Sequence, residues 1–363
     1  MATTYGNNIK ISIYGGSHDE EIGIIASGLP AGESFDFGKL LEFMKRRAPG
    51  NAKFATARKE PDMPILVSGV KEGYILDGQE FKAVIKNTNM HSSDYSNLVD
   101  VPRPSHADYP ARVKYGDKVD LRGGGHFSGR LTAPMCIVGG ICLQILEKMG
   151  IEIAAHIYSV KDEKDIAFDP CFVNSEDFKK LSSRDFPTLS PEAGEKIQEV
   201  IEGARSEGDS VGGIIECAVI GLPVGIGEHM FAGLEGRISS ILFSVPAVKA
   251  VEFGNGFDAT RLFGSENNDP YFVEDGKIKT KTNNCGGICG GMSNGMPLIF
   301  RAGIKPTPSI AKEQDSVSLS RLENTKLVIK GRHDPCIIPR AVPVIEAAAA
   351  IAILDAILDK KAE

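Results

Sequence analysis

The sequence lacks the features of an exported, membrane-spanning or nucleic-acid-binding protein. The N-terminal segment MATTYGNNIKISIYGG has neither the basic part nor the apolar part of a signal peptide. The apolar stretches 131–146 and 347–354 are too short, or too interrupted by Pro and Gly, to predict a membrane span. Acidic residues outnumber basic ones by 48 to 41, so no overall field attracts nucleic acid or an anionic membrane. We therefore expect a cytoplasmic protein that binds neither nucleic acid nor membrane.

Familiar metal and nucleotide motifs are also missing. The seven cysteines form no CxxC pair and no Cys/His zinc spacing, which predicts reduced thiols and no bound metal. Neither GxGxxG nor GxxxxGK[ST] occurs, so no nucleotide-binding fingerprint is present. The segment 291–295 matches the hydrolase elbow GxSxG, but an elbow must lead into a helix, and residues 296–304 have the pattern of a strand. We therefore reject Ser293 as a nucleophile.

The remaining composition is that of a folded protein of mixed α/β class. Of its 363 residues, 42% are hydrophobic and 25% charged, which excludes disorder and coiled coil. Apolar alternation predicts strands over 9–14, 22–27, 65–70, 83–85, 151–160, 213–220 and 298–304. Helical periodicity predicts helices over 37–47 and 191–206, and the runs 132–149 and 343–358 are apolar on most sides, as in helices of a central layer. No linker or charge block divides the chain, so we expect one domain over 1–363.

Six segments combine Gly or Pro turns with ionisable side chains. They are YGGSHD at 14–19, KRRAPG at 45–50, RPSHADY at 103–109, LRGGGHFSGR at 121–130, GIKPTPS at 303–309 and GRHDPCIIPR at 331–340. His18, His106 and His333 each have an Asp within two residues. Histidine exchanges protons near neutral pH, which makes these residues candidates for general acid–base catalysis. The alternative is that each histidine is a turn residue bonded to nearby backbone.

The same segments carry basic side chains, although the protein as a whole is acidic. These are Arg46, Arg47, Lys53, Arg122, Arg130, Lys305, Arg332 and Arg340. Arginine forks bind phosphate and carboxylate, and Gly turns let backbone amides approach an anion, so the pattern predicts a local anion site. Two other interpretations stay open. The charges could be solvated surface groups, or the His/Asp pairs could bind a divalent metal in a phosphohydrolase.

Taken together and in this order, the segments resemble chorismate synthases. The likeness extends from Gly15 to about Leu358 and rests on RPSHADY, the RGGG segment ending in Arg130, GGICGGMSNG, KPTPS, and GRHDPC followed by PRAVPV. It implies a single-domain α+β fold, a β-α-β sandwich with helices layered between antiparallel-rich sheets, and a homotetramer. It also implies 1,4-anti elimination of phosphate from 5-enolpyruvylshikimate 3-phosphate to give chorismate, the last step of the shikimate pathway. The reaction needs reduced FMN, without net redox change.

The resemblance assigns roles to particular residues. It implies that His18 protonates the departing phosphate, that His106 protonates the flavin, and that Asp334 acts with the flavin in removing the C6 hydrogen. Substrate anions would be bound by Arg47, Arg130 and Arg340. Cofactor-binding positions would be Lys53, His126, Phe127, Ser128, Pro246, Ala247, Gly290, Lys305, Pro306, Thr307, Pro308, Ser309 and Arg332.

The chain departs from the family pattern at three places. The usual GESHG is GGSHD at 15–19, the usual RSSAR is HFSGR at 126–130, and the frequent Asn before Ala247 is Pro246. Because no nucleotide fingerprint is present, we expect the chain not to reduce flavin with NADPH itself but to depend on an external flavin reductase activity. The alternatives are a metal-dependent phosphohydrolase and a flavin-binding homologue that has lost catalysis.

Overall fold

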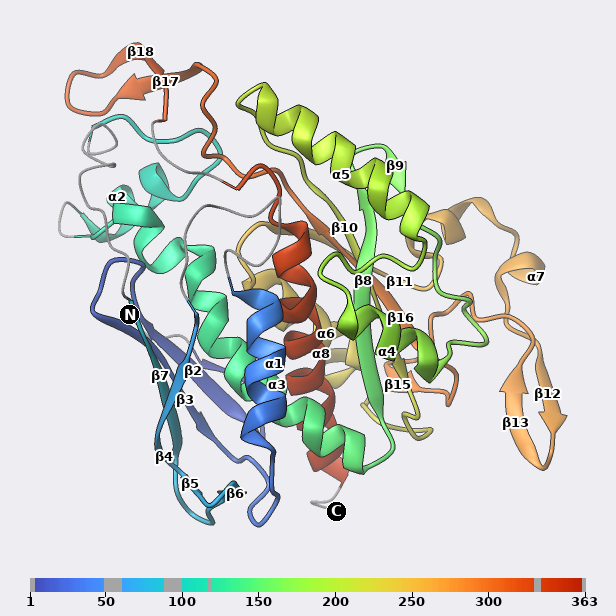
Figure 1. The fold of residues 1–363 in the computed structure, drawn as a ribbon. Coiled ribbons are helices and arrows are strands. Elements are labelled where there is room, and N and C mark those ends of the chain that lie inside the picture. Colours follow the sequence, from blue (N-terminus) through green and yellow to red (C-terminus); the bar gives the residue numbers. More distant parts are fainter. Residues whose placement is uncertain (1–3, 49–60, 88–99, 117–118, 330–333, 361–363) are drawn as a thin grey trace.

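The computed structural model describes residues 4–48, 61–87, 100–116, 119–329 and 334–360. Two sheets enclose a layer of helices (Figure 1). The first sheet has the order β1-β2-β3-β7-β4, formed by Thr4–Tyr5, Lys10–Gly15, Glu21–Ser27, Phe81–Lys86 and Pro64–Ser68. The second has the order β11-β16-β10-β8-β9, formed by Val248–Phe253, Leu298–Ile304, Gly213–Ile220, Glu152–Val160 and Glu163–Lys164. Every strand pair in the described chain is antiparallel.

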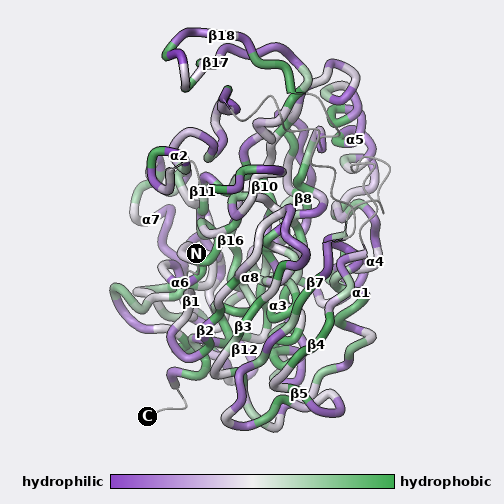
Figure 2. The backbone as a smooth tube through the Cα atoms, turned by 90° about the vertical axis from the view of Figure 1, so that its left-hand side faces the viewer, coloured by the Kyte–Doolittle hydropathy of each residue, from purple (hydrophilic) through white to green (hydrophobic). Residues whose placement is uncertain are grey.

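Four helices fill the space between the sheets. They are α1 (Phe37–Arg47), α3 (Thr132–Lys148), α6 (Leu234–Ser244) and α8 (Ile338–Lys360). Figure 2 shows the hydrophobic tube of α3 and α8 running through the middle of the molecule. The predicted β-α-β sandwich, with the helices as its central layer, is confirmed.

Small residues let α3 and α8 approach closely. A Cβ atom added to Gly139 of α3 would lie 2.2 Å from the Cβ of Ala347 in α8. At the next residue of α3, a Cβ atom added to Gly140 would lie 2.7 Å from the side chain of Leu40 in α1. At Gly139 the added atom would also lie 2.5 Å from the Cα of Ala347, so in a close-packed interior a methyl group has no room there, whereas at Gly140 it meets only side-chain atoms of Leu40 and Phe43. Gly139 therefore sets the spacing between α3 and α8.

Two more helices pack against the second sheet at β8 and β9. They are α4 (Ser175–Ser183), which contacts β8, and α5 (Pro191–Ser206), which contacts β8 and β9 and adds Ile197 and Ile201 to the main core. The start of α5 follows the local sequence, because the Oγ of Ser190 accepts a hydrogen bond from the amide of Ala193 at 3.2 Å and Pro191 occupies the first helical position. The remaining elements are α2 (Asp108–Tyr115), α7 (Gly264–Asn267) and four short hairpins. The hairpins are β5–β6 (Val70–Lys71, Tyr74–Ile75), β12–β13 (Tyr271–Glu274, Lys277–Thr280), β14–β15 (Ile288–Cys289, Met292–Ser293) and β17–β18 (Gln314–Ser318, Glu323–Leu327).

The structure corrects three sequence predictions. The strand predicted over 65–70 is divided into β4 and β5, because Gly69 adopts a φ of +78° between them. The helices α2, α4 and α6 and the strand β11 were not predicted. The expectation that the apolar stretches are too short to span a bilayer is wrong as to length, since Gly129–Lys148 and Ile338–Asp359 are both long and apolar enough. The second of these is longer than the apolar run 347–354 because Pro343 does not end α8. Their most apolar windows are 83% and 94% buried inside the fold, as in core helices.

Candidate active site

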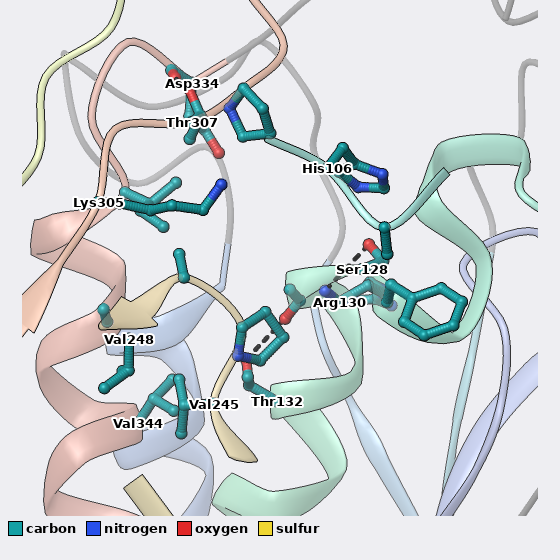
Figure 3. A pocket seen from close by; sticks show the side chains of 18 of the residues that line it. His106, Ser128, Arg130, Thr132, Val245, Val248, Lys305, Thr307, Asp334 and Val344 are labelled. Atoms are coloured by element: carbon teal, nitrogen blue, oxygen red, sulfur yellow. Dashed lines mark hydrogen bonds between the residues drawn. The ribbon is translucent and has the colours of Figure 1, made fainter. Parts of the chain in front are cut away.

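A cavity of about 700 Å³ opens where the central helices meet the glycine- and proline-rich loops (Figure 3). The end of α6, the start of α8 and the segments around 105, 127 and 307 all contribute to its wall. Val245, Val248 and Val344 lie together at one end of the view, whereas Lys305, Thr307 and Asp334 lie at the other. The cavity therefore combines an apolar wall with a cationic and polar one.

Most of the predicted site residues line this cavity. They are Arg47, His106, His126, Phe127, Ser128, Arg130, Pro246, Ala247, Lys305, Thr307, Pro308, Ser309, Asp334 and Arg340. Three predicted residues are not part of its lining, namely His18, Pro306 and Gly290. Lys53, Arg332 and His333 lie outside the described residues.

A turn of three glycines separates His18 from His106. Gly123, Gly124 and Gly125 all have positive φ, at 59°, 92° and 51°. A Cβ on Gly123 would lie 2.3 Å from Cε1 of His18, and one on Gly124 would lie 3.5 Å from Nε2 of His106. His18 therefore packs directly behind a residue of the cavity wall. Only glycine supplies both the backbone conformation and the space.

Two of the predicted substrate-binding arginines share one buried carboxylate. Asp62, of which 1% is exposed, accepts from Nη1 of Arg47 at 2.6 Å and also pairs with Arg130. Arg130 is held further by Asn87, whose Oδ1 lies 3.1 Å from Nε of Arg130. Burial raises the pKa of Asp62, but the two guanidinium groups lower it more, so the carboxyl group stays ionised. Asp62 was not among the predicted site residues, because no local motif marks it and its partners are far away in the sequence.

Arg340 joins the same cluster from the other side. Its Nη1 lies 2.7 Å from Oδ2 of Asp334, and its Nε donates to the backbone oxygen of Arg47 at 3.2 Å. The hydroxyl of Thr307 donates to the backbone oxygen of Asp334 at 3.0 Å. The structure thus brings a candidate acid–base residue into direct contact with a candidate substrate-binding arginine.

Lys305 lines the cavity from the end of β16. Its Nζ donates to the backbone oxygen of Ser105 at 2.6 Å, and burial together with the nearby Lys249 lowers its pKa. Its amide donates at 3.0 Å to the backbone oxygen of Ala247. Ala247 adopts a φ of +76°, a strained conformation for a residue with a side chain. A strained backbone held beside a cationic side chain is typical of a binding site.

The other predicted residues occupy structural positions. Gly290 forms the turn between β14 and β15, next to Gly291, whose backbone oxygen accepts from the amide of Leu234 at the start of α6. The cavity lies at the other end of that helix. Ser293 donates to the backbone oxygen of Pro223 at 2.5 Å and accepts from the amide of Ile226 at 2.9 Å, and β15 leads to another strand. The segment after Ser293 is therefore a strand, as predicted, and not the helix that a hydrolase elbow requires.

The fold and site define the class of protein as an α+β sandwich with an arginine-lined cavity. The family model for chorismate synthase matches residues 9–358. A chorismate synthase of Lancefieldella parvula is 46% identical over 98% of this chain and 96% of the relative, and one of Pyrococcus abyssi is 42% identical over 98% of both. A crystal structure of chorismate synthase superimposes with a TM-score of 0.74 at 26% identity, covering 98% of this chain and 93% of that one.

The chain therefore belongs to the chorismate synthase family. It is an enzyme of the lyase class that acts on a phosphate-containing substrate, as the resemblance in its motifs implied.

Proposed function

We propose that this enzyme eliminates phosphate from 5-enolpyruvylshikimate 3-phosphate to give chorismate in the presence of reduced FMN. The observation that carries the proposal is the convergence of Arg47, Arg130 and Arg340 on one cavity from three distant parts of the chain. The substrate has one phosphate and two carboxylates, and guanidinium groups bind both kinds of anion with paired hydrogen bonds. An uncharged or singly charged substrate would not need three arginines.

The arginines would act on the bond that breaks. As the carbon–oxygen bond to phosphate is cleaved, negative charge accumulates on the phosphate, and fixed cations stabilise this charge more strongly in a water-poor cavity. Asp62 holds two of the guanidinium groups in place before substrate binds. His18, behind Gly123, would give a proton to the departing phosphate, while Asp334 would receive the hydrogen lost from C6 as a proton.

The residues present fit a flavin nucleotide. The valine-rich wall suits the face of a flat ring system, and Lys305 with Ser128 and Ser309 supplies polar groups for its edge and its phosphate. When bound, reduced FMN would lend electron density to the elimination and regain it, so that no net oxidation results. His106 would hold a proton at the flavin edge. Lys53, Pro306, Gly290 and Arg332 stay predictions of cofactor contact, because they lie outside either the cavity lining or the described residues.

Membership of the family supports four further proposals. We expect a single catalytic domain over 1–363, a homotetramer, a cytoplasmic location and flavin reduced by a separate activity. The buried positions of α3 and α8 support a folded core rather than a membrane anchor.

The two alternatives are less well supported. The described residues contain no group of three or more His, Cys, Asp or Glu side chains placed to hold a metal ion, and His106 and Asp108 are engaged with each other. A metal-dependent phosphohydrolase therefore has no visible centre in the described part of the chain. A binding protein without catalysis would keep the cavity, and only a measurement of turnover separates it from an enzyme.

The deciding experiment is anaerobic incubation with 5-enolpyruvylshikimate 3-phosphate and reduced FMN, oxidised FMN or no flavin, in parallel. Chorismate formed only with reduced FMN is the expected result. Phosphate released without chorismate would indicate hydrolysis. Flavin binding without any reaction would indicate an inactive homologue.

A further inference from the structure

A buried ion pair lies beneath His106. The carboxylate of Asp108, of which 1% is exposed, accepts from Nε of Arg103 at 2.7 Å, from its Nη2 at 2.8 Å and from its backbone amide at 3.0 Å. The Oδ1 atom of the same carboxylate lies 2.6 Å from Nδ1 of His106. Asp108 therefore joins a buried arginine to the histidine of the cavity wall.

These contacts fix which nitrogen of His106 carries the proton. A carboxylate only accepts, so the short contact with Oδ1 requires a hydrogen on Nδ1. Arg103 also only donates. Its Nη2 carries two hydrogens and lies 2.8 Å from Oδ1 of Asp108 and 3.1 Å from Nδ1 of His106, so with a hydrogen on Nδ1 the hydrogen bond from Nη2 is the one to Asp108. Hydrogen bonds from Arg103 and His106 outweigh the effect of burial and hold the pKa of Asp108 well below its usual range, so it remains an acceptor. Nε2 is left free to exchange a proton, and it faces Gly124, which has no side chain to block it.

The carboxylate does not serve its own helix. Asp108 is the first residue of α2, where an acidic side chain ordinarily accepts from the amides of the first turn. Here Ala107 is the N-cap without a side-chain bond, and both oxygens of Asp108 point back to Arg103 and His106. Ser105 adopts a φ of +57° to turn the chain back over Asp108. The strained turn at Ser105 and the uncapped start of α2 are both explained if the role of the Asp108 carboxylate is to bind His106.

The pair is also tied to a cofactor-binding segment. Nη1 of Arg103 donates to the Oγ of Ser309 at 3.2 Å. Lys305 holds the backbone oxygen of Ser105 from the same segment. The ring of His106 is therefore fixed relative to the 305–309 segment through two links.

We propose that Asp108 is a positioning residue of the reaction, fixing His106 in the tautomer with hydrogen on Nδ1 and Nε2 available to the ligand, while Arg103 holds Asp108. The expected effect of Asp108 on turnover rests on the proposed function, whereas its expected effect on the tautomer of His106 does not. An Asp–His pair of this kind orients the imidazole and stabilises its protonated form, as in serine-protease triads. Mutation of such an aspartate leaves binding intact and lowers turnover.

The test is Asp108→Asn, with Asp355→Asn as the matched control. Asp355 is another carboxylate of 1% exposure paired with a buried arginine, Arg237, and it forms no hydrogen bond or ion pair with any histidine that the structure describes. We expect Asp108→Asn to lower kcat by about 10²–10⁴-fold, the range of acid–base catalysis, with KM and the Kd of FMN changed by less than about threefold. The control should lower Tm but leave kcat of the folded fraction close to wild type. Asp108→Glu, which keeps the charge, should recover part of kcat.

Two further measurements separate positioning from folding and from the proposed function. In ¹⁵N-histidine-labelled protein, the His106 resonances, assigned by their loss in His106→Gln, should change from the Nδ1–H to the Nε2–H pattern in Asp108→Asn. If wild type forms no chorismate, the proposed function fails. The ¹⁵N spectrum of His106 still tests whether Asp108 fixes the tautomer. In the His106→Gln background, Asp108→Asn should lower kcat little further, because Asp108 acts on the reaction through His106. An unchanged tautomer, or losses that multiply in the double variant, would overturn the proposal.

Discussion

The carboxylate shared by two arginines gives the sharpest prediction about the site. Asp62→Asn keeps the size of the side chain but removes the charge between Arg47 and Arg130. The two guanidinium groups, 4% and 8% exposed as residues, would then lose the anion that they share. We therefore expect Asp62→Asn to be less stable than wild type. We also expect its cavity to bind an anion more tightly.

The magnitude follows from the burial of the pair. Removing one partner of a buried ion pair costs about 3–5 kcal/mol, because the remaining charge stays desolvated. With an unfolding entropy of about 2.1 cal/mol/K per residue, a chain of 363 residues loses about 1.3 °C of Tm per kcal/mol. Asp62→Asn should therefore lower Tm by about 4–7 °C.

Inorganic phosphate distinguishes this explanation from general damage. Arg47 and Arg130 both line the cavity, so a phosphate ion bound there would compensate for the lost negative charge. A ligand at ten times its Kd stabilises a protein by about 1.4 kcal/mol. The assay is thermal unfolding over a phosphate series at constant ionic strength. The variant should gain its extra stability at lower phosphate concentrations than wild type.

An exposed pair supplies the control. Asp315 lies 2.6 Å from Lys326 on the β17–β18 hairpin, with both side chains more than half exposed, and Asp315→Asn should cost no more than about 1 kcal/mol. The reasoning is refuted if Asp62→Asn is as stable as Asp315→Asn, or if phosphate stabilises wild type and Asp62→Asn equally.

Four other substitutions have outcomes that the structure predicts. Gly123→Ala should lower turnover more than tenfold and destabilise the protein, because its Cβ would lie 2.3 Å from His18 and its φ is positive, as activity and Tm will show. His156→Gln should cost stability most below pH about 6.5. Burial lowers the pKa of His156 but two carboxylates raise it more, so the stability it contributes is lost as pH rises through the folded-state pKa, which urea unfolding at several pH values measures. Gly139→Ala should lower Tm, whereas Gly203→Ala, in an exposed helical position with open space, should raise the free energy of unfolding by about 0.4–1 kcal/mol.

Each of these has a contradicting result. Gly150 has a φ of +77° and open space around its Cβ position, so the loss of Tm in Gly150→Ala measures the cost of the backbone conformation alone. If Gly123→Ala and Gly150→Ala lose the same Tm, a steric clash between residue 123 and His18 is contradicted. A stability difference for His156→Gln that does not depend on pH would contradict a charged His156. Equal effects of the two helical glycine substitutions would show that the α3–α8 spacing can relax.

Local pattern determined much of the secondary structure. The strands β10 and β16 and the helices α1 and α5 have the bounds that periodicity and capping predicted, since each depends on residues close in sequence. The helices α2 and α4 are short and α6 begins after a glycine without a side-chain cap, so their local signals were too weak. The motifs likewise identified the family, because the segments that carry them are contiguous.

Only the tertiary structure decided how those segments work together. Nothing in the sequence indicates that Asp62 serves Arg47 and Arg130, because Arg130 lies 68 positions away and the contact exists only when the sheet and α3 meet. The sequence placed Asp108 near His106, but only the fold shows that Arg103 pairs with this carboxylate and that its Oδ1 lies 2.6 Å from Nδ1 of His106. Residue types and spacing determine which chemistry is available, whereas burial, shared partners and the direction of hydrogen bonds depend on the packed chain.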